Sequence, residues 1–317
     1  MPLYLTESDV QSLLDMPLAL EALDEVFKAR ARGDAYNNPR RRLPTGSGAY
    51  NFMAASWPAK GVVGHKSYAG GRGGVSFHVM IYGTSGEGLL AVMGANRLGQ
   101  VRTGAASGLA TRYMALEDAA DVAVIGSGYQ AETQLEAVAA VRSLKRARVY
   151  SRTPERRNTY AERMSERLGI KVSPSESAES CVSGADVVIV ITNSVEPVLT
   201  GDMIAPGVHV NAAGNNSWMK SELDTAAVAK ADIVAVDDVD QAKIECGELM
   251  RAAETGRFSW DTAIPLADIA AGLRSGRSSA TDVTLFESQG VALEDVAVAE
   301  RIYRLALERG VGTELPA

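Results

Sequence analysis

The chain of 317 residues lacks the features that mark several common protein classes. Its two cysteines, Cys181 and Cys246, have no CxxC spacing, which argues against a disulfide or zinc framework and favours a reducing, cytoplasmic location. No apolar run approaches the ~20 residues of a membrane span, and the acidic N-terminal stretch does not resemble a signal peptide. A net charge of −7 argues against a nucleic-acid partner. We therefore expect a cytoplasmic protein of two domains, with no membrane or nucleic-acid partner.

Histidine is also scarce. His65, His78 and His209 are scattered, and no Ser-His-Asp order, HExxH motif or P-loop accompanies them. Each histidine is more readily explained as structural than as catalytic, and no metal site is expected.

The pattern of residues changes character at Asp121. Before it, residues 6–35 predict two helices broken near Pro17, the first opened by a capping box of Thr6 and Asp9. Residues 37–48, "NNPRRRLPTGSG", predict a loop, and residues 50–95 predict short antiparallel strands separated by glycines. After it, apolar β-branched runs alternate with helices, which predicts a parallel sheet covered on both faces.

A glycine-rich turn follows the first of those runs. Gly126, Gly128 and Ala131 form G-x-G-x-x-A directly after "VAVI" and before a helix. The first glycine permits a tight turn, the second lets a pyrophosphate approach the backbone, and the small third residue lets helix and strand pack closely. Because the context is right on both sides, the motif predicts dinucleotide binding.

The next strand predicts which dinucleotide is preferred. NAD sites usually place Asp or Glu at its end, to bind the ribose, but this chain has Ser151, Arg152 and Thr153, with Arg156 beyond. Hydroxyls and guanidinium groups suit a 2′-phosphate, which an acid would repel. The loop therefore favours NADP(H), with NAD(H) as the alternative, although a solvated basic loop would look the same.

Three basic residues outside this region have unusual neighbours. Lys66 lies inside an apolar strand, where a lysine is costly without a partner. Arg102 is surrounded by small residues in "LGQVRTGAASG", and Arg41 lies in "PRRRLP". Taken singly, each is more readily structural than functional.

Residues 208–216, "VHVNAAGNN", predict a buried strand that ends in small residues and two amides. Small residues at a strand end leave room for a flat ligand against the backbone. Asn215 and Asn216 stand where an enzyme that moves protons would be expected to place a carboxylate or a histidine.

Together these stretches resemble the ornithine cyclodeaminase/μ-crystallin family. The matching pieces are P-x-R at 39–41, Lys66, "RTGAA" from 102, "GSGYQA" from 126, "TNSVEPVL" from 192, "PGVHVNAAG" from 206, "SELD" from 221, "GEL" from 247 and "TLFESQGVALED" from 284. They occur in order over nearly the whole chain. The resemblance implies an α/β fold in which a Rossmann dinucleotide-binding domain (119–288) is inserted into an α/β substrate and dimerisation domain formed by both termini (1–118 plus 289–317). It also implies a homodimer.

The family includes cyclodeaminases, alanine dehydrogenases and ketimine or imino-acid reductases, which move a hydride between a nicotinamide and the α-carbon of an amino acid or its imine. The resemblance implies that Arg41, Lys66 and Arg102 hold the substrate carboxylate and that Lys66 and Asn216 are catalytic. The cofactor-binding residues expected from the glycine loop and the resemblance are Gly126, Gly128, Tyr129, Gln130, Ala131, Ser151, Arg152, Thr153, Arg156, Thr192, Asn193, Ala213, Gly214, Ser288 and Gly290.

Asn216 indicates which of these reactions to expect. Cyclodeaminases and alanine dehydrogenases of the family carry an aspartate there, whereas an asparagine cannot shuttle protons but can donate and accept hydrogen bonds. Reduction of a preformed imine needs hydride delivery and charge placement. The sequence thus favours an NADP(H)-dependent reductase that converts a carboxylate-bearing imine to an L-amino acid. An amino-acid dehydrogenase or cyclodeaminase, and a non-catalytic binding protein of μ-crystallin type, are the alternatives. Whether Arg40 or Arg42 binds a second substrate carboxylate stays open.

Overall fold

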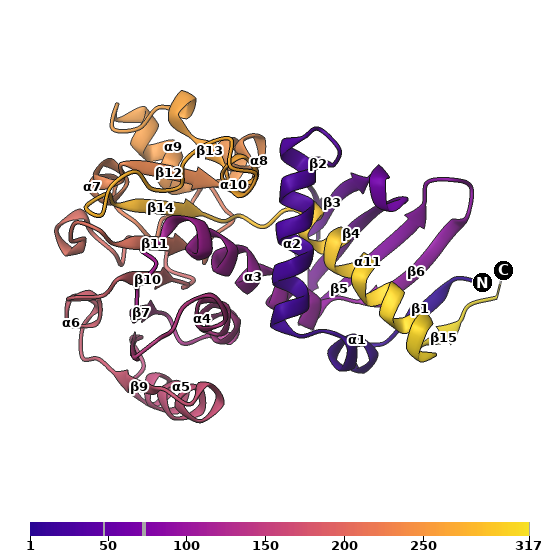
Figure 1. Ribbon diagram of the computed structural model, residues 1–317, viewed down its shortest axis with the longest axis horizontal. Coiled ribbons are helices and arrows are strands. Elements are labelled where there is room, and N and C mark those ends of the chain that lie inside the picture. Colours follow the sequence, from indigo (N-terminus) through magenta and orange to yellow (C-terminus); the bar gives the residue numbers. More distant parts are fainter. Residues whose placement is uncertain (47, 72–73, 317) are drawn as a thin grey trace. The chain divides into compact units, whose positions relative to one another are not determined.

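A computed structural model describes residues 1–46, 48–71 and 74–316 and divides the chain into two compact units (Figure 1). Unit 1 comprises Met1–Arg102 and Val291–Ala317, and unit 2 comprises Thr103–Gly290. The chain leaves unit 1 once and returns to it, so the predicted α/β fold with an inserted domain is confirmed.

The division lies at 102/103, inside helix α3 (Asn96–Met114), where the sequence suggested 118/119, and at 290/291, where it suggested 288/289. The second half of α3 belongs to unit 2 by its contacts. Asn211 Nδ2 donates to Thr111 Oγ1 at 2.9 Å, and Gln134 Nε2 donates to the Thr103 carbonyl at 3.1 Å. A helix that continues across a domain boundary gives no break in its sequence pattern.

Unit 1 is built on a seven-stranded sheet in the order β15-β1-β6-β5-β4-β3-β2. Its strands are β1 (Leu3–Leu5), β2 (Tyr36–Thr45), β3 (Gly48–Trp57), β4 (Val62–Gly71), β5 (Gly74–Gly83), β6 (Gly88–Gly94) and β15 (Thr313–Glu314). Its helices are α1 (Glu7–Leu13), α2 (Met16–Ala31), the 3₁₀ turn η1 (Pro58–Lys60), the first half of α3, and α11 (Ala292–Arg309). The predicted antiparallel pairing is confirmed from β3 to β6, and so is the capping box of Thr6 and Asp9.

One row of cross-strand partners in this sheet contains Lys66. The row runs Met53, Lys66, Val79, Met93 and Leu5, and every member is buried. Helix α11 packs along strands β3 and β4 and against α2 (Figure 1). Lys66 is thus the one charged member of an otherwise apolar row.

The adjacent row faces the other way, because successive side chains alternate across a strand. It runs Ala54, His65, Met80, Val92 and Tyr4, and its members are half-buried or exposed. His65 and Lys66 therefore lie on opposite faces of the sheet.

The loop predicted for residues 37–48 is wrong for most of that stretch, whose residue 47 lies outside the described part. Residues up to Thr45 form β2, which pairs with β3 through a register shift between Asn38 and Arg41. β2 is the last strand of the sheet, and an edge strand tolerates proline because one of its sides needs no ladder hydrogen bond. Pro39 and Pro44 therefore do not break it.

Unit 2 contains an eight-stranded parallel sheet in the order β13-β12-β14-β11-β10-β7-β8-β9. Its strands are β7 (Asp121–Ile125), β8 (Arg146–Tyr150), β9 (Lys171–Pro174), β10 (Val187–Val190), β11 (His209–Ala212), β12 (Ile233–Val236), β13 (Ile264–Pro265) and β14 (Thr284–Glu287). Its helices are α4 (Tyr129–Val141), α5 (Pro154–Leu168), α6 (Ala178–Val182), α7 (Thr225–Lys230), α8 (Val239–Glu245), α9 (Gly247–Glu254) and α10 (Leu266–Ala270), with 3₁₀ turns η2 (Gly201–Met203) and η3 (Trp260–Thr262).

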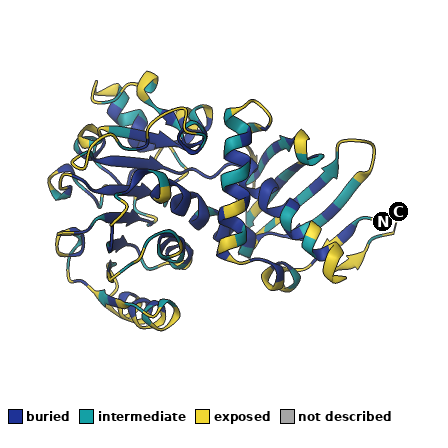
Figure 2. Ribbon diagram, viewed as in Figure 1, coloured by how far each residue is buried: buried dark blue, intermediate teal, exposed yellow. Residues whose placement is uncertain are grey.

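Two hydrophobic clusters cover the two faces of this sheet. On one face, Leu135 of α4 and Met164 of α5 pack with Val124. On the other, Cys181 of α6 and Leu249 of α9 join the second cluster. Figure 2 shows the strands of this sheet as buried, which agrees with the parallel sheet covered on both faces that the sequence predicts. Among the described residues, no helix combines the length and hydrophobicity of a membrane-spanning segment.

Candidate functional site

The glycine turn after β7 has the geometry that a dinucleotide needs. Gly126 has φ +116°, and a side chain there would collide with the Ile191 carbonyl oxygen, so only glycine fits. Gly128 is the N-cap of α4, and a Cβ built on it meets no protein atom within 4 Å, which leaves open space in front of the helix N-terminus. Ala131 is fully buried against the sheet, as close packing of helix on strand requires. Tyr129 and Gln130 form the first turn of α4.

A cavity of about 220 Å³ lies at the carboxyl ends of β7, β8 and β10. Strand order reverses between β7 and β10, and such a switch point is where open parallel sheets bind ligands. Of the residues expected to bind the cofactor, the cavity is lined by Gly126, Gly128, Ser151, Arg152, Thr153, Arg156, Thr192 and Asn193. The glycine turn, the open helix terminus and this cavity fit a dinucleotide.

The end of this cavity next to β8 is basic and hydroxylated. Ser127 Oγ donates a hydrogen bond to Ser151 Oγ at 2.9 Å, and β8 ends at Tyr150 without an acid. Arg152 and Arg156 are exposed, and neither forms an ion pair within the described part of the chain. Two guanidinium groups are thereby available to an anion.

Glu222, which the sequence did not single out, joins the loops after β10 and β11. Its carboxylate accepts hydrogen bonds from the Thr192 N–H and hydroxyl, at 2.5 and 2.7 Å, and from the Gly214 N–H at 2.8 Å. A side chain on Gly214 would collide with this carboxylate. Burial raises the pKa of Glu222 to about 7, against the effect of these hydrogen bonds. In the sequence, the only indication of this role was that Glu222 in "SELD" follows a strand end that has no acid of its own.

The loop after β11 carries the two amides Asn215 and Asn216 and no acid. Asn215 is buried and donates to the Ser194 carbonyl at 3.3 Å, while Asn216 is exposed. Ala213 N–H donates to the Val190 carbonyl, which fixes the backbone beside them. The nearby acid Glu222 is already occupied by backbone and hydroxyl donors.

The remaining two expected cofactor residues follow β14 and are held by an aspartate. Gly290 N–H donates to Asp237 Oδ2 at 2.6 Å, and Ser288 Oγ donates to the same oxygen at 3.3 Å. Gly290 has φ +73°, a conformation that favours glycine. They lie outside the lining of the cavity described above.

A second group of buried acids lies at the end of β14. Donor atoms of Cys246, Glu248 and Glu287 lie within 4.8 Å of one another, close enough in principle to share a metal ion. Burial, reinforced by the neighbouring Glu248, raises the pKa of Glu287 well above its usual value. Burial likewise raises the pKa of Glu248 and of the Cys246 thiol. Each of these shifts favours the protonated form of its group.

Unit 1 contains a buried network of opposite charges around Lys66. Lys66 Nζ donates to Asp295 Oδ1 at 2.9 Å, and Arg102 Nε donates to the same oxygen at 3.0 Å. Arg102 Nη1 donates to Glu294 Oε2 at 2.6 Å. The two acids follow one another in α11 and have no exposed side-chain surface. Neither acid was predicted to have a role, although two adjacent acids in the apolar stretch "ALEDVAVA" were a usable signal.

Arg40, and not Arg41, is buried beside this network. Arg40 is 3% exposed and lowers the pKa of Lys66 through its charge, whereas Arg41 and Arg42 are exposed. Arg41 pairs with Phe52, and Phe52 alternates with Met53, the partner of Lys66. Arg41 therefore lies on the opposite face of the sheet from Lys66. The bulge in β2 reverses which of two adjacent arginines faces inward, and nothing in the residue pattern indicates a bulge.

Burial lowers the pKa of Lys66 to about 8. Asp295 opposes this effect, and the positive charges of Arg102 and Arg40 add to it. The ammonium group also lies 5.5 Å from the Phe77 ring centroid. Lys66 is thus a cation near neutral pH that can lose its proton in mildly alkaline solution.

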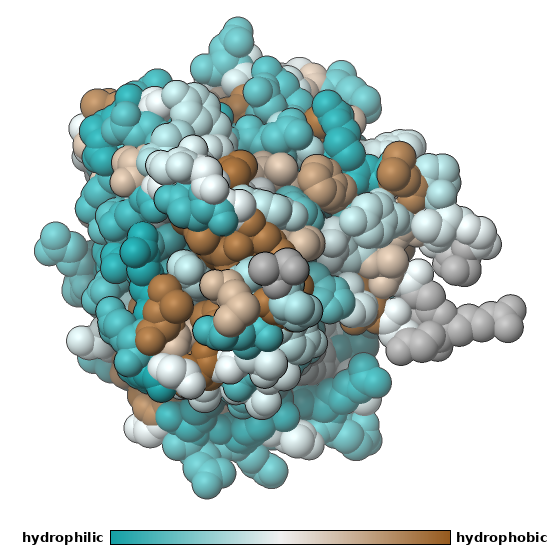
Figure 3. Space-filling view, turned by 90° about the vertical axis from the view of Figure 1, so that its right-hand side faces the viewer, coloured by the Kyte–Doolittle hydropathy of each residue, from teal (hydrophilic) through white to brown (hydrophobic). Residues whose placement is uncertain are grey.

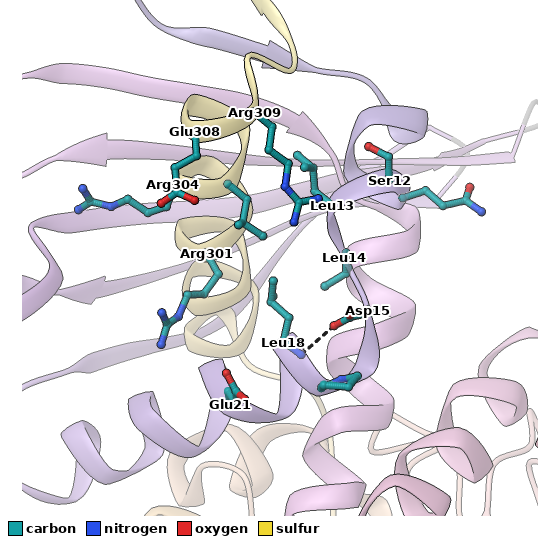
Figure 4. Close-up of a pocket in the computed structure, with 13 residues that line it drawn as sticks. Ser12, Leu13, Leu14, Asp15, Leu18, Glu21, Arg301, Arg304, Glu308 and Arg309 are labelled. Carbon is teal, nitrogen blue, oxygen red and sulfur yellow. Dashed lines mark hydrogen bonds between the residues drawn. The ribbon is translucent and has the colours of Figure 1, made fainter.

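A further cavity of about 620 Å³ in unit 1 lies between the connection of α1 to α2 and the last turns of α11 (Figure 4). Its charged groups are of both signs. Arg301 pairs with Glu25 at 2.6 Å, and Arg304 pairs with Glu300 at 2.9 Å. None of the residues expected in the site lines this cavity.

A parallel sheet with a dinucleotide cavity, and a second unit with a buried cationic network, define a nicotinamide-dependent oxidoreductase of two units. Residues 2–310 match the Ornithine cyclodeaminase/mu-crystallin family, so the chain belongs to that family and the resemblance is confirmed. It is accordingly an NAD(P)-dependent oxidoreductase that acts on CH–NH or CH–NH₂ groups.

Three solved structures illustrate the similarity. The Thermococcus litoralis Δ¹-pyrroline-2-carboxylate reductase, in complex with NADH and L-proline, is 32% identical, with a TM-score of 0.94 over 99% of this chain and 100% of its own. The iminosuccinate reductase of Paracoccus denitrificans, in complex with NAD⁺, is 29% identical, with a TM-score of 0.94 over 100% and 99%. An archaeal alanine dehydrogenase dimer with bound NAD is 32% identical, with a TM-score of 0.93 over 99% of both chains.

Proposed function

We propose that this protein is an NADP(H)-dependent reductase that converts an α-imino acid to an L-amino acid. The observation that carries the proposal is the strand end Gly214–Asn216, which offers amides where a deaminating relative would need an acid. An amide can orient an imine or a carboxamide by hydrogen bonds but cannot take up a proton at neutral pH. When bound, the cofactor supplies a hydride to the α-carbon of the imine and is oxidised in return.

The buried cations of unit 1 bind the substrate carboxylate in this proposal. Lys66 and Arg102 donate charge-assisted hydrogen bonds to it, which fixes the α-carbon in position. Arg40 takes the role that the sequence analysis gave to Arg41, because Arg40 is the buried arginine of β2. Asn216 orients the imine in this proposal, and Lys66 is the group of the network whose lowered pKa lets it release a proton to the product amine.

The preference for NADP(H) rests on the loop after β8. Arg152 and Arg156 offer guanidinium groups to a 2′-phosphate, and the strand ends in Ser151 with no carboxylate to repel it. The solved relatives hold NADH or NAD⁺, so the proposed preference draws no support from them.

We also propose that the protein is a homodimer that uses the open face of the unit 1 sheet. The row of Ala54, His65, Met80, Val92 and Tyr4 presents mostly apolar side chains on the face that α11 does not cover. Hydrophobic side chains gather among hydrophilic ones on the face of the molecule seen in Figure 3. An exposed apolar sheet face is typical of an interface, and Met80→Glu should yield monomers in analytical ultracentrifugation.

Ammonia dependence tests the proposed reaction. Wild-type protein and NADPH are assayed with Δ¹-pyrroline-2-carboxylate alone, with pyruvate plus ammonium, and with iminosuccinate, while ornithine is assayed with NADP⁺. The proposal predicts turnover of a preformed imine without ammonium. Turnover only of pyruvate with ammonium would support an amino-acid dehydrogenase, ammonia release from ornithine would support a cyclodeaminase, and tight NADPH binding without any turnover would support a binding protein.

A further inference from the structure

Asp295 is the common partner of two cations in the buried network of unit 1. A single oxygen, Oδ1, accepts from Lys66 Nζ at 2.9 Å and from Arg102 Nε at 3.0 Å. The exposed fraction of each side chain is small, at 4% for Lys66, 7% for Arg102 and 0% for Asp295. Charge-assisted hydrogen bonds so far from water are strong and directional.

The acceptor and donor capacity of this network is only partly used. Asp295 Oδ2 and Glu294 Oε1 are buried and accept no hydrogen bond within the described part of the chain. The Lys66 ammonium group has three N–H donors, of which the described residues take one, through Asp295. Lys66 is therefore held at a fixed point while N–H groups remain for a ligand.

Charged and aromatic groups approach Lys66 from four elements. Arg40 comes from β2, Arg102 from α3, Asp295 with its neighbour Glu294 from α11, and Phe77 from β5. Two of these groups are cations that disfavour a charged lysine, and Asp295 is the acid that directly contacts the amine. Gly99 of α3 leaves the space the amine occupies, because a Cβ there would lie 2.8 Å from Nζ.

We propose that Asp295 is a positioning residue for the reaction, which keeps Lys66 cationic and aligns it with Arg102 so that both can bind one substrate carboxylate. This role rests on the proposed function and adds to it the group that sets the working pH range. Without an acid at this place, three buried cations would repel one another, and Lys66 would lose its proton at a lower pH. A pair of cations fixed before substrate arrives also loses little freedom on binding.

The experiment compares pH profiles of wild type and Asp295→Asn, with Δ¹-pyrroline-2-carboxylate and NADPH. For wild type, kcat/KM should fall above about pH 8, as Lys66 deprotonates. For Asp295→Asn, this alkaline fall in kcat/KM should begin at least about one pH unit lower. At pH 7, kcat/KM should therefore fall about tenfold or more, mainly because KM rises, and a lower pH should restore activity. A general loss of structure would not recover in acid.

Glu300→Gln is the matched control, since Glu300 is a buried acid of the same helix that pairs with Arg304. It should keep the wild-type pH limb. If Asp295→Asn lowers activity equally at all pH values, or leaves the limb in place, the proposal is overturned. If Asp295→Asn does not fold, Gly99→Ala serves in its place, because the added methyl group displaces the Lys66 amine from Asp295. The alkaline fall in kcat/KM should then also begin at a lower pH, and an unchanged pH profile overturns the proposal.

A measurement without turnover separates this inference from the proposed reaction. The folded-state pKa of Lys66, about 8, lies below the unfolded value of about 10.4. Relative to Lys66→Met, the free energy of unfolding should therefore rise between these pH values. In the Asp295→Asn or Gly99→Ala background the rise should begin at a lower pH. If wild type reduces no imine but this shift is seen, the proposed function fails and the link between Asp295 and Lys66 stands. If imines are reduced and the shift is absent, the link fails alone.

Discussion

Lys66 and Asp295 are 229 residues apart in the chain, yet Lys66 Nζ lies 2.9 Å from Asp295 Oδ1. The contact exists because the last long helix of the chain returns to the sheet formed by its first hundred residues. It brings Glu294 and Asp295 to the buried cations Arg102 and Lys66, and the contact with Asp295 makes a lysine in an apolar row tolerable.

The two adjacent arginines of β2 should respond differently to truncation. Arg40→Ala removes a buried cation beside Lys66 and should lower kcat/KM for an imino acid by about tenfold to a hundredfold, the value of one charge-assisted hydrogen bond. Arg41→Ala removes an exposed side chain on the other face and should change kcat/KM less than about threefold. Steady-state kinetics of both variants decide the matter, and a larger loss for Arg41→Ala would reverse the assignment.

Arg40 and Arg41 illustrate which features of the structure could be predicted from the sequence and which could not. Fold, motif order and the cofactor turn were predictable because glycine spacing and β-branched runs are local signals. The strand register was not, because a bulge moves every later side chain to the other face without changing composition.

The acids were missed for a related reason. Asp295 and Glu294 become meaningful only beside Lys66 and Arg102, which lie far away in sequence. Glu222 is similar, since its partners Thr192 and Gly214 lie in two other loops. Pairwise contacts between distant segments leave no pattern in a single sequence.

Arg152→Asp should reverse the cofactor preference. Wild type should use NADPH more efficiently than NADH, and the variant should use NADH more efficiently, because a carboxylate repels the 2′-phosphate and can accept from a ribose hydroxyl. Arg148→Ala is a suitable control, since that arginine donates to the Cys181 carbonyl and lies outside the cavity. Equal or better use of NADH by wild type would contradict the assignment of this loop.

Neutral substitutions of two buried acids of unit 2, Glu287 and Asp237, should change the free energy of unfolding in opposite directions. The folded-state pKa of Glu287 is raised well above the unfolded value of about 4.3, so wild type loses stability as the pH rises beyond that value. Glu287→Gln removes this loss and should raise the free energy of unfolding at pH 8, and by less at pH 5. Asp237→Asn should lower it by about 1–3 kcal/mol, because Asp237 accepts the Gly290 N–H.

Chemical denaturation at several pH values measures both effects. A clear destabilisation by Glu287→Gln at pH 8 would show that Glu287 is needed as an anion, for example to hold a metal with Cys246 and Glu248.

Asn216→Asp should add a pH limb that wild type lacks. The new carboxylate would titrate near pH 4–5 and could exchange protons with the substrate, which an amide cannot. Asn216→Ala should instead lose rate about equally at every pH, by the roughly 1–3 kcal/mol of a lost hydrogen bond. The pH dependence of kcat/KM for the two variants separates orientation from proton transfer. A pH profile of Asn216→Ala that differs in shape from the wild-type profile would show that the amide takes part in proton transfer.

Isotope transfer distinguishes imine reduction from the alternative reactions. Wild-type protein is incubated with NADPH deuterated at C4 of the nicotinamide and with Δ¹-pyrroline-2-carboxylate, without ammonium, and the product is analysed by NMR and chiral chromatography. The account predicts L-proline with one deuterium at the α-carbon and one NADPH oxidised per product molecule. An unlabelled α-carbon would contradict hydride transfer to that carbon, and an absolute requirement for ammonium across all the preformed imines tested would contradict imine reduction.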